Sequence, residues 1–272
     1  MKIRTLMIVV VCLIIALGLF SGIFAQSIQR VLTVMPPVAQ AMQQTISKMN
    51  NSTTIPTPAT TPTAPTVVAQ MPGTVTMLAQ DTFQRTDQAL WGTASDGRIW
   101  EGDANNQNVA NSFAIKGGMG VIANTQGTLN ALLGPINGDM EVLASGTVSQ
   151  FDTPNVNFGV VLRWNDNNNW YKALIDGHNL TVLSRVNGVT TQLGTVQFPA
   201  QAGTAYSIRF RAIGSTLFAK VWASNTTEPT NWMLTLMDTA LTTGHGGVRV
   251  LLEKNVTIQV SSFIETTVSG MM

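Results

Sequence analysis

The chain has 272 residues, a formal net charge of +1 and 11% charged residues, against the roughly 25% of a typical soluble domain. Most of its surface must therefore be covered by uncharged polar side chains, and the near-neutral charge argues against a nucleic-acid binder, which needs clustered Lys and Arg. The single cysteine, Cys12, excludes an internal disulfide and a cysteine-based zinc cluster.

Residues 1–26 have the pattern of an export segment. Lys2 and Arg4 precede an uncharged run whose apolar core, Leu6 to Ala25, would span roughly 30 Å as a helix, the thickness of a bilayer core. The same run fits a secretory signal cleaved after Ala25, but Ile23 is larger than the peptidase prefers, so we favour an uncleaved anchor. Both interpretations place the rest of the chain outside the cytoplasm. With an uncleaved anchor, residues 5–26 cross the cell membrane once and the C-terminal domain is extracellular; with a cleaved signal, the protein is secreted.

Two connecting segments follow. Residues 27–49 include a stripe of Val38, Met42, Ile46 and Met49 at helical spacing, which predicts at most a short amphipathic helix over 38–49. That stripe could bind a protein partner or lie on the membrane, and the alternative is a weakly ordered stem, since helices this short are marginal alone. Residues 50–74 are uncharged and rich in Thr and Pro, which predicts an extended linker.

Residues 75–269 change to short runs in which apolar and polar residues alternate, as in Tyr206–Ala212, Leu217–Val221 and Val256–Val260. Such runs number roughly a dozen, are spaced at about 10 to 15 residues, and have no helical pattern between them. We predict an all-β fold: a two-sheet antiparallel jelly-roll sandwich, preceded by the export segment and the linker.

The clearest hairpin lies between Val156 and Ile175. Strands Val156–Trp164 and Asn169–Ile175 flank Asn165–Asn168, a run of residues that favours turns. With Leu162 opposite Tyr171, one face is buried and the other is solvent-exposed, and a slip of one residue would bury Lys172 among apolar side chains. The predicted buried face holds Phe158, Val160, Leu162, Tyr171, Ala173 and Ile175, and the predicted exposed face holds Arg163, Trp170 and Lys172.

Four groups of residues, in chain order, carry a family resemblance. They are Asp81, Thr82, Phe83, Arg85, Trp91, Gly92 and Trp100; Gly159, Val161, Leu162, Arg163, Trp164, Trp170, Tyr171 and Ala173; Tyr206, Ile208, Phe210, Gly214, Leu217 and Trp222; and Trp232, Asp238, Gly244, Gly246, Gly247 and Phe263. In this order they resemble the concanavalin A-like lectin and glucanase superfamily, in the laminin-G-like jelly-roll form of exported bacterial proteins. The resemblance implies that the first strand, near Thr82, lies beside the last, near Phe263. It also implies glycan binding on the concave face or at the loop rim, sometimes with calcium.

The carboxylates do not form the superfamily's catalytic pattern. Its glucanases use a Glu, Asp, Glu cluster on one strand, because hydrolysis needs two carboxylates in defined roles. Here the pairs Glu101/Asp103 and Asp139/Glu141 lack the third acid, so no catalytic residue is predicted and we expect a protein that is not an enzyme. His178 and His245 lie beside glycines in turn-like sequence and are assigned to loops.

Metal and cofactor binding are not predicted either. Calcium could be held by loop carboxylates such as Asp139, Asp152 or Asp238, but no loop has a dense acidic ligand pattern. The sequence therefore predicts neither a metal nor a cofactor.

The candidate ligand-binding residues are Arg163, Asp166, Asn168, Trp170 and Lys172. Sugars lay their C–H faces on aromatic rings while nearby polar side chains bond the hydroxyls. The alternative is that Arg163 simply covers Trp170 and the Asn run only makes the turn. Trp100 and Trp222 are weaker candidates of the same kind, whereas Trp91, Trp164 and Trp232 are assigned to packing.

The pattern as a whole favours a membrane-attached, cell-surface carbohydrate-binding or adhesion module without catalytic activity, whose partner is a glycan. One alternative is a structural accessory subunit of a membrane or envelope complex, docked through its anchor and residues 38–49. A second alternative is a glycoside hydrolase-like enzyme with two acids brought together from separate strands.

Overall fold

The computed structural model describes residues 75–151 and 155–268. The predicted export segment, the segment 27–49 and the linker 50–74 lie outside these residues and stay predictions, as do the domain boundaries. The described residues form sixteen β-strands and two 3-10 helices, η1 (Asp103–Asn105) and η2 (Gln107–Ser112). Neither described helix is long and apolar enough to cross a membrane.

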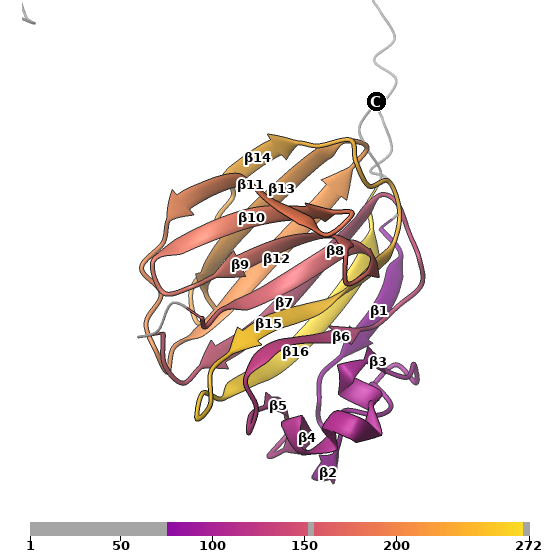
Figure 1. The fold of residues 1–272 in the computed structure, drawn as a ribbon, viewed down its shortest axis with the longest axis vertical. Coiled ribbons are helices and arrows are strands. Elements are labelled where there is room, and N and C mark those ends of the chain that lie inside the picture. The colour runs from indigo at the N-terminus through magenta and orange to yellow at the C-terminus, as the bar shows by residue number, and fades with distance from the viewer. Residues whose placement is uncertain (1–74, 152–154, 269–272) are drawn as a thin grey trace, which may run out of the picture. The chain divides into compact units, whose positions relative to one another are not determined.

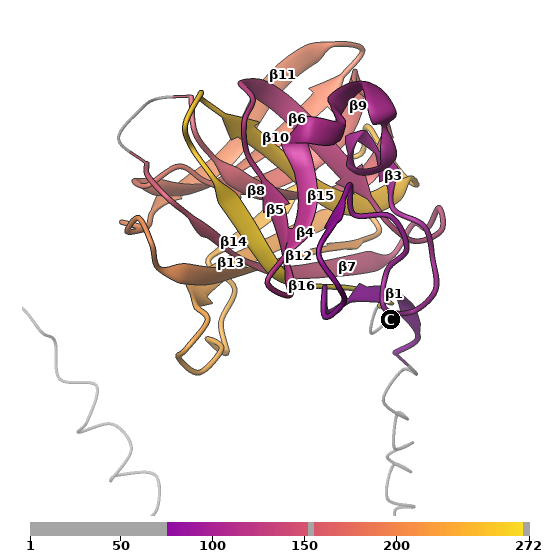
Figure 2. The ribbon, with the colours of Figure 1, turned by 90° about the horizontal axis from the view of Figure 1, so that it is seen from below.

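The strands form two antiparallel sheets (Figure 1). The first sheet runs in the order β14 (Leu234–Met237), β13 (Thr216–Ala223), β12 (Ala205–Ile213), β7 (Met140–Val148), β16 (Ile258–Thr267), β5 (Met119–Ile122), β4 (Phe113–Lys116) and β2 (Gln88–Ala89), with β1 (Met77–Asp81) also on β16. The second runs in the order β11 (Val189–Gln197), β10 (Asn179–Val186), β9 (Asn169–Ile175), β8 (Phe158–Asp166), β15 (His245–Leu252), β6 (Gly127–Leu132) and β3 (Glu101–Gly102). Figure 2 shows β7, β12 and β16 in one layer and β8, β10 and β15 in the other. The predicted two-sheet sandwich is therefore confirmed for the described residues.

Alternation along each strand places one row of side chains between the sheets. In the β8–β9 hairpin Leu162 pairs with Tyr171, as predicted. All six residues assigned to the buried face are fully buried. The turn is shorter than predicted, because β8 continues to Asp166, which pairs with Asn169 and leaves Asn167 and Asn168 to reverse the chain.

The first strand closes the sheet against the last. Asp81 pairs with Phe263, which confirms the pairing that the resemblance implied. The Asp81 carboxylate accepts hydrogen bonds from Trp100 Nε1 at 2.7 Å, Arg85 Nη1 at 2.8 Å and the Phe83 amide at 2.8 Å. The expectation that Trp100 faces a ligand is wrong: it is fully buried, stacked on Phe83 at 5.8 Å between ring centroids.

Residues 224–233, which connect β13 to β14, lie against the outer face of the first sheet. The Glu228 carboxylate accepts hydrogen bonds from Arg209 Nη2 of β12 at 2.9 Å and lies 2.7 Å from Lys220 Nζ of β13. Lys220 Nζ also donates to the Pro229 carbonyl at 2.7 Å and lies 4.8 Å from the centroid of the Trp232 ring. Trp232 thus packs as the sequence predicted, while Trp222 is 9% exposed on the same face.

Candidate functional site

The outer face of the second sheet carries the residues that the sequence singled out. Its side chains alternate with the buried ones, so Trp170 and Lys172 of β9, Arg185 of β10 and Arg249 of β15 all point away from the core. The prediction that this face is solvent-exposed is wrong for its centre, because Trp170 and Lys172 are each only 4% exposed. The side chains of neighbouring strands cover one another there.

Trp170 lies in a group that we call the Trp170 cluster: Trp170, Arg185, Arg249, Asn130 and Asn167. Arg185 is directly opposite Trp170 on β10. The guanidinium carbon of Arg249 lies 4.7 Å from the centroid of the indole ring, and Trp170 Nε1 donates to the Asn167 carbonyl at 3.1 Å. A cation over the face of an indole is held by the ring quadrupole, so Arg249 occupies the position that a sugar would need.

Arg249 is fixed by amide side chains. It donates to Oδ1 of Asn130 and to Oδ1 of Asn167, and Asn130 Nδ2 donates to Asn167 Oδ1 at 3.2 Å. Burial and the charge of Arg185 lower the pKa of Arg249 to about 10, an effect that Asp103 partly offsets. Arg249 therefore stays protonated at neutral pH, although burial and the nearby charge of Arg185 disfavour its charged form.

Lys172 turns away from Trp170. Its chain lies against Gly159, where a Cβ atom would come within 2.6 Å of Lys172 Cε, and its Nζ donates to Asn157 Oδ1 at 2.6 Å. Burial, followed by the charge of Arg249, lowers the pKa of Lys172 well below its ordinary value. Lys172 thus lies under the surface rather than on it.

Arg163 does not lie beside Trp170 as predicted. The ladder between β8 and β9 is irregular between Leu162 and Asp166, and Arg163 has a φ of 50°, which turns its side chain inward. It is 1% exposed and donates to the carbonyls of Gly138, Leu241 and Gly214 at 3.0, 2.8 and 2.7 Å. Arg163 therefore bridges the ends of the two sheets, and burial lowers its pKa despite the nearby Asp139.

The hairpin tip holds the exposed members of the predicted set. Asp166 Oδ1 accepts the Asn168 amide at 2.6 Å, and this bond and one from the Asn169 side chain lower the pKa of Asp166. The Asn168 carbonyl accepts the Gly188 amide at 3.1 Å, which joins the tip to the β10–β11 turn. Asp166, Asn168 and Trp170 thus lie near one another at one end of the outer face.

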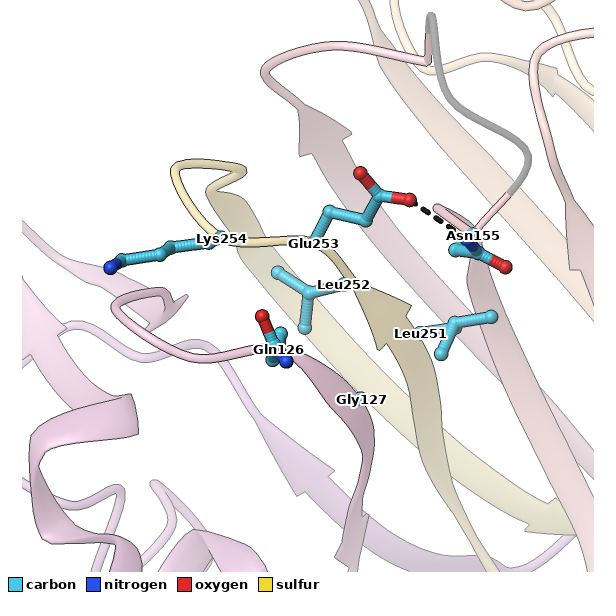
Figure 3. A pocket seen from close by; sticks show the side chains of 7 residues that line it. All are labelled: Gln126, Gly127, Asn155, Leu251, Leu252, Glu253 and Lys254. Atoms are coloured by element: carbon cyan, nitrogen blue, oxygen red, sulfur yellow. Dashed lines mark hydrogen bonds between the residues drawn. The ribbon is translucent and has the colours of Figure 1, made fainter.

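A pocket of about 420 Å³ lies at the other end of this face, where β8 and β6 begin and β15 ends (Figure 3). Leu251 is two residues after Arg249 on β15 and therefore lies on the same outer face. Asn155 Nδ2 donates to Glu253 Oε1 at 2.9 Å across the rim, and Figure 3 shows Lys254 extending away from this pair. The residues lining the pocket are Gln126, Gly127, Asn155, Leu251, Leu252, Glu253 and Lys254.

The acids considered for catalysis or calcium serve other contacts. Asp139 accepts the Gly214 amide at 2.7 Å, Asp238 accepts the Tyr171 hydroxyl at 2.6 Å, and Glu141 is paired with Arg209 and Arg211. Asp152 lies outside the described residues. Among the residues that are described, no three His, Cys, Asp or Glu side chains gather as a metal site would require.

Comparisons with known proteins bear on the fold. No family model matches the chain, and no curated protein matches its sequence. Among solved structures, the chain is similar to the carbohydrate-binding module CBM66 from Bacillus subtilis, with a TM-score of 0.50 and 14% identity over 62% of this chain and 95% of that one. The likeness shows the fold alone, a β-sandwich such as the sequence pattern predicts.

Two further solved structures are similar at lower scores. The beta-glucanase of Bacillus licheniformis has a TM-score of 0.49 and 12% identity over 71% of this chain and 98% of its own. The GH43 protein BlXynB from Bacillus licheniformis has a TM-score of 0.49 and 13% identity over 69% of this chain and 39% of its own. The chain thus spans well under half of the length of that second protein.

Sequence reasoning missed Arg249 and Arg185 and the pocket. Alternation with Val248 and Val250 places Arg249 on an outer face, which the sequence does show. The sequence does not show which side chains lie beside Arg249, because β15 pairs with β8 and β6, and both strands are distant from β15 along the chain. The pocket depends on the same pairings.

Proposed function

We propose that the β-sandwich is a non-catalytic carbohydrate-binding module and that its sugar enters the pocket at the start of β8 and β6. The observation that carries the proposal is the position of this pocket: it lies at the end of the outer face of the second sheet, in a fold shared with a carbohydrate-binding module.

The chemistry of the pocket supports this assignment. Sugars need hydrogen-bonding groups for hydroxyls and apolar surface for their C–H faces. Gln126 and Asn155 can both donate and accept, Glu253 accepts, Lys254 donates, and Leu251 supplies apolar surface.

The absence of catalysis belongs to the proposal as well. The two acid pairs considered for hydrolysis lie apart from the pocket: Glu101 is on β3, Asp103 is in η1, and Glu141 faces outward from the first sheet. The anchor at residues 5–26, the cell-surface location and a protein partner at residues 38–49 also remain part of the proposal, and they depend on the sequence pattern alone.

The test uses the full chain, solubilised in a detergent without a sugar head group, and affinity electrophoresis against a panel of neutral and charged polysaccharides. We expect retardation by at least one polymer without release of reducing ends. Asn155→Ala should weaken binding about fivefold, since one hydrogen bond is worth about 1 kcal/mol.

The matched control is Gln259→Ala, because Gln259 lines a second pocket, of about 430 Å³, which includes Thr147 of the first sheet. It should leave binding unchanged. No retardation by any polymer, or equal losses in Asn155→Ala and Gln259→Ala, would contradict the proposal, and release of reducing ends would contradict its non-catalytic part.

A further inference from the structure

The cations of the described residues divide into two groups. Six of the eleven Lys and Arg side chains in residues 75–151 and 155–268 form ion pairs with Asp or Glu: Arg85, Arg98, Arg163, Arg209, Arg211 and Lys220. The other five form none with a described residue: Lys116, Lys172, Arg185, Arg249 and Lys254.

Four of these five lie along one surface. Lys254 is at the pocket, Lys172 and Arg249 are in the middle of the outer face of the second sheet, and Arg185 is next to the hairpin tip. Out-facing residues on a strand are roughly 6.6 Å apart, so the three steps from the level of Leu251 to that of Arg185 span roughly 20 Å. Lys116, by contrast, belongs to β4 of the first sheet.

Arg249 lies close enough to Arg185 and to Lys172 for their positive charges to oppose one another. The charge of Arg185 is the second cause, after burial, of the lowered pKa of Arg249, and Arg249 has the same place in the lowered pKa of Lys172. Arg185 Nε, moreover, is buried without a hydrogen-bond partner among the described residues. An anion bound from outside would relieve this repulsion.

Acidic side chains near this surface lie at its margins. Asp103 is engaged with the Asn130 amide at 2.9 Å, Asp166 with the amides of the tip, and Glu253 with Asn155. Glu101 is exposed on the edge strand β3. The central part of the surface, between the pocket and the tip, is left with positive charge.

We propose that the glycan is acidic and lies along the outer face of the second sheet, with its carboxylate or sulfate groups bound at Lys254 and Arg185. Arg249, which is buried between these two positions, supplies positive potential from beneath, while Lys172 lies deeper, with its Nζ on Asn157. This inference depends on the proposed carbohydrate binding and specifies the class of sugar polymer.

The experiment compares polymers that share a sugar backbone and differ in their charged groups, on the full chain in the same detergent. Polygalacturonate is paired with its methyl ester, and dextran sulfate with dextran, so the two pairs distinguish carboxylate from sulfate. We expect one charged member to bind at least about tenfold more tightly than its neutral partner, with affinity falling steeply between about 50 and about 500 mM NaCl. Arg185→Gln and Lys254→Gln should each weaken that binding roughly threefold to tenfold.

Lys116→Gln is the matched control, since it removes from the other sheet a cation that forms no ion pair with a described residue, and it should change nothing. Equal binding of charged and neutral polymers overturns the acidic-glycan inference while the carbohydrate-binding proposal stands. An equal loss in Lys116→Gln also overturns the inference, because it indicates attraction by net charge. Failure of all four polymers together with the wider neutral panel contradicts the proposed function itself.

Discussion

Glu265 places an ionisable carboxyl group between the two sheets. It points inward from β16 and is 0% exposed, and neither carboxyl oxygen has a hydrogen-bond partner among the described residues. Gly134 and Gly246 make room for it, since a Cβ atom at either position would lie 2.6 Å from Glu265 Oε2. Burial raises the pKa of Glu265 from 4.5 to about 8, although the charge of Arg98 acts in the opposite direction.

This raised pKa predicts a stability that falls with rising pH. Between pH 4.5 and about 8 the folded protein holds a proton that the unfolded chain has released, so the free energy of unfolding decreases across this range. The loss is at most about 1.4 kcal/mol per pH unit, or on the order of 3 kcal/mol between about pH 5 and about pH 7.5. Glu265→Gln, which cannot ionise, should flatten this slope in urea unfolding measured at both pH values. The control is Glu101→Gln on the exposed β3, and a Glu265→Gln slope equal to that of the parent chain would refute the prediction.

Arg163 and Tyr171 show how far a residue's environment could be predicted. Strict alternation placed Tyr171 correctly, because a register slip of one residue would have exchanged the two faces of the strand and put Lys172 among apolar side chains. The same rule placed Arg163 on the wrong side, since its φ of 50° breaks the alternation. Positive φ is uncommon outside glycine, and no neighbouring residue type indicated it here.

At the scale of strands, pairings between neighbours in the sequence were easier to predict than pairings between distant strands. The β8–β9 hairpin is set by its turn and its apolar pattern, both visible within 20 residues or so. The Trp170 cluster instead joins residues such as Asn130 and Arg249, which are 119 positions apart, and depends on the order of strands in the sheet. Strand order is settled by how both sheets pack, which a single strand's pattern does not contain.

The β13–β14 connection, residues 224–233, offers a prediction at the same scale. Although burial acts to raise the pKa of Glu228, hydrogen bonds from Lys220 and Arg209 lower it, so the carboxylate holds the connection on the sheet in its charged form. Glu228→Gln should increase the frequency with which the connection opens by roughly fivefold, because the contacts of Glu228 with Arg209 and Lys220 are partly exposed to solvent. Hydrogen exchange of residues 224–233 measures this.

Thr227→Val is the control for that experiment, because Thr227 is exposed on the same connection. Exchange in β12 and β13 should not change in either variant. Equal exchange of the connection in Glu228→Gln and the parent chain would show that Trp232 and Pro229 hold it without the carboxylate.

For the whole molecule, closure of the first sheet by β1 joins the two ends of the domain. The Thr76 amide donates to Thr267 Oγ1 at 2.9 Å, and the Thr267 amide donates to the Thr76 carbonyl at 2.8 Å. Asp81, at the end of β1, is the acceptor for Trp100 in the core. The strand is therefore required by the core as well as by the sheet edge.

We accordingly expect a chain of residues 75–269 to fold on its own and a chain of residues 83–269 to fail. Without β1, buried donors such as Trp100 Nε1 lose their acceptor, at a cost of about 1–3 kcal/mol each, and β16 loses a hydrogen-bonded neighbour. The combined loss is a large share of the roughly 5–15 kcal/mol that stabilises a domain. Near-UV circular dichroism, which reports the packing of Trp91 and Trp100, should be retained by the longer chain and lost by the shorter. Asp81→Asn in the longer chain separates the two causes, because it removes the charge from this hydrogen-bond network but keeps the strand. A native spectrum for residues 83–269 would mean that the aromatic core closes without β1.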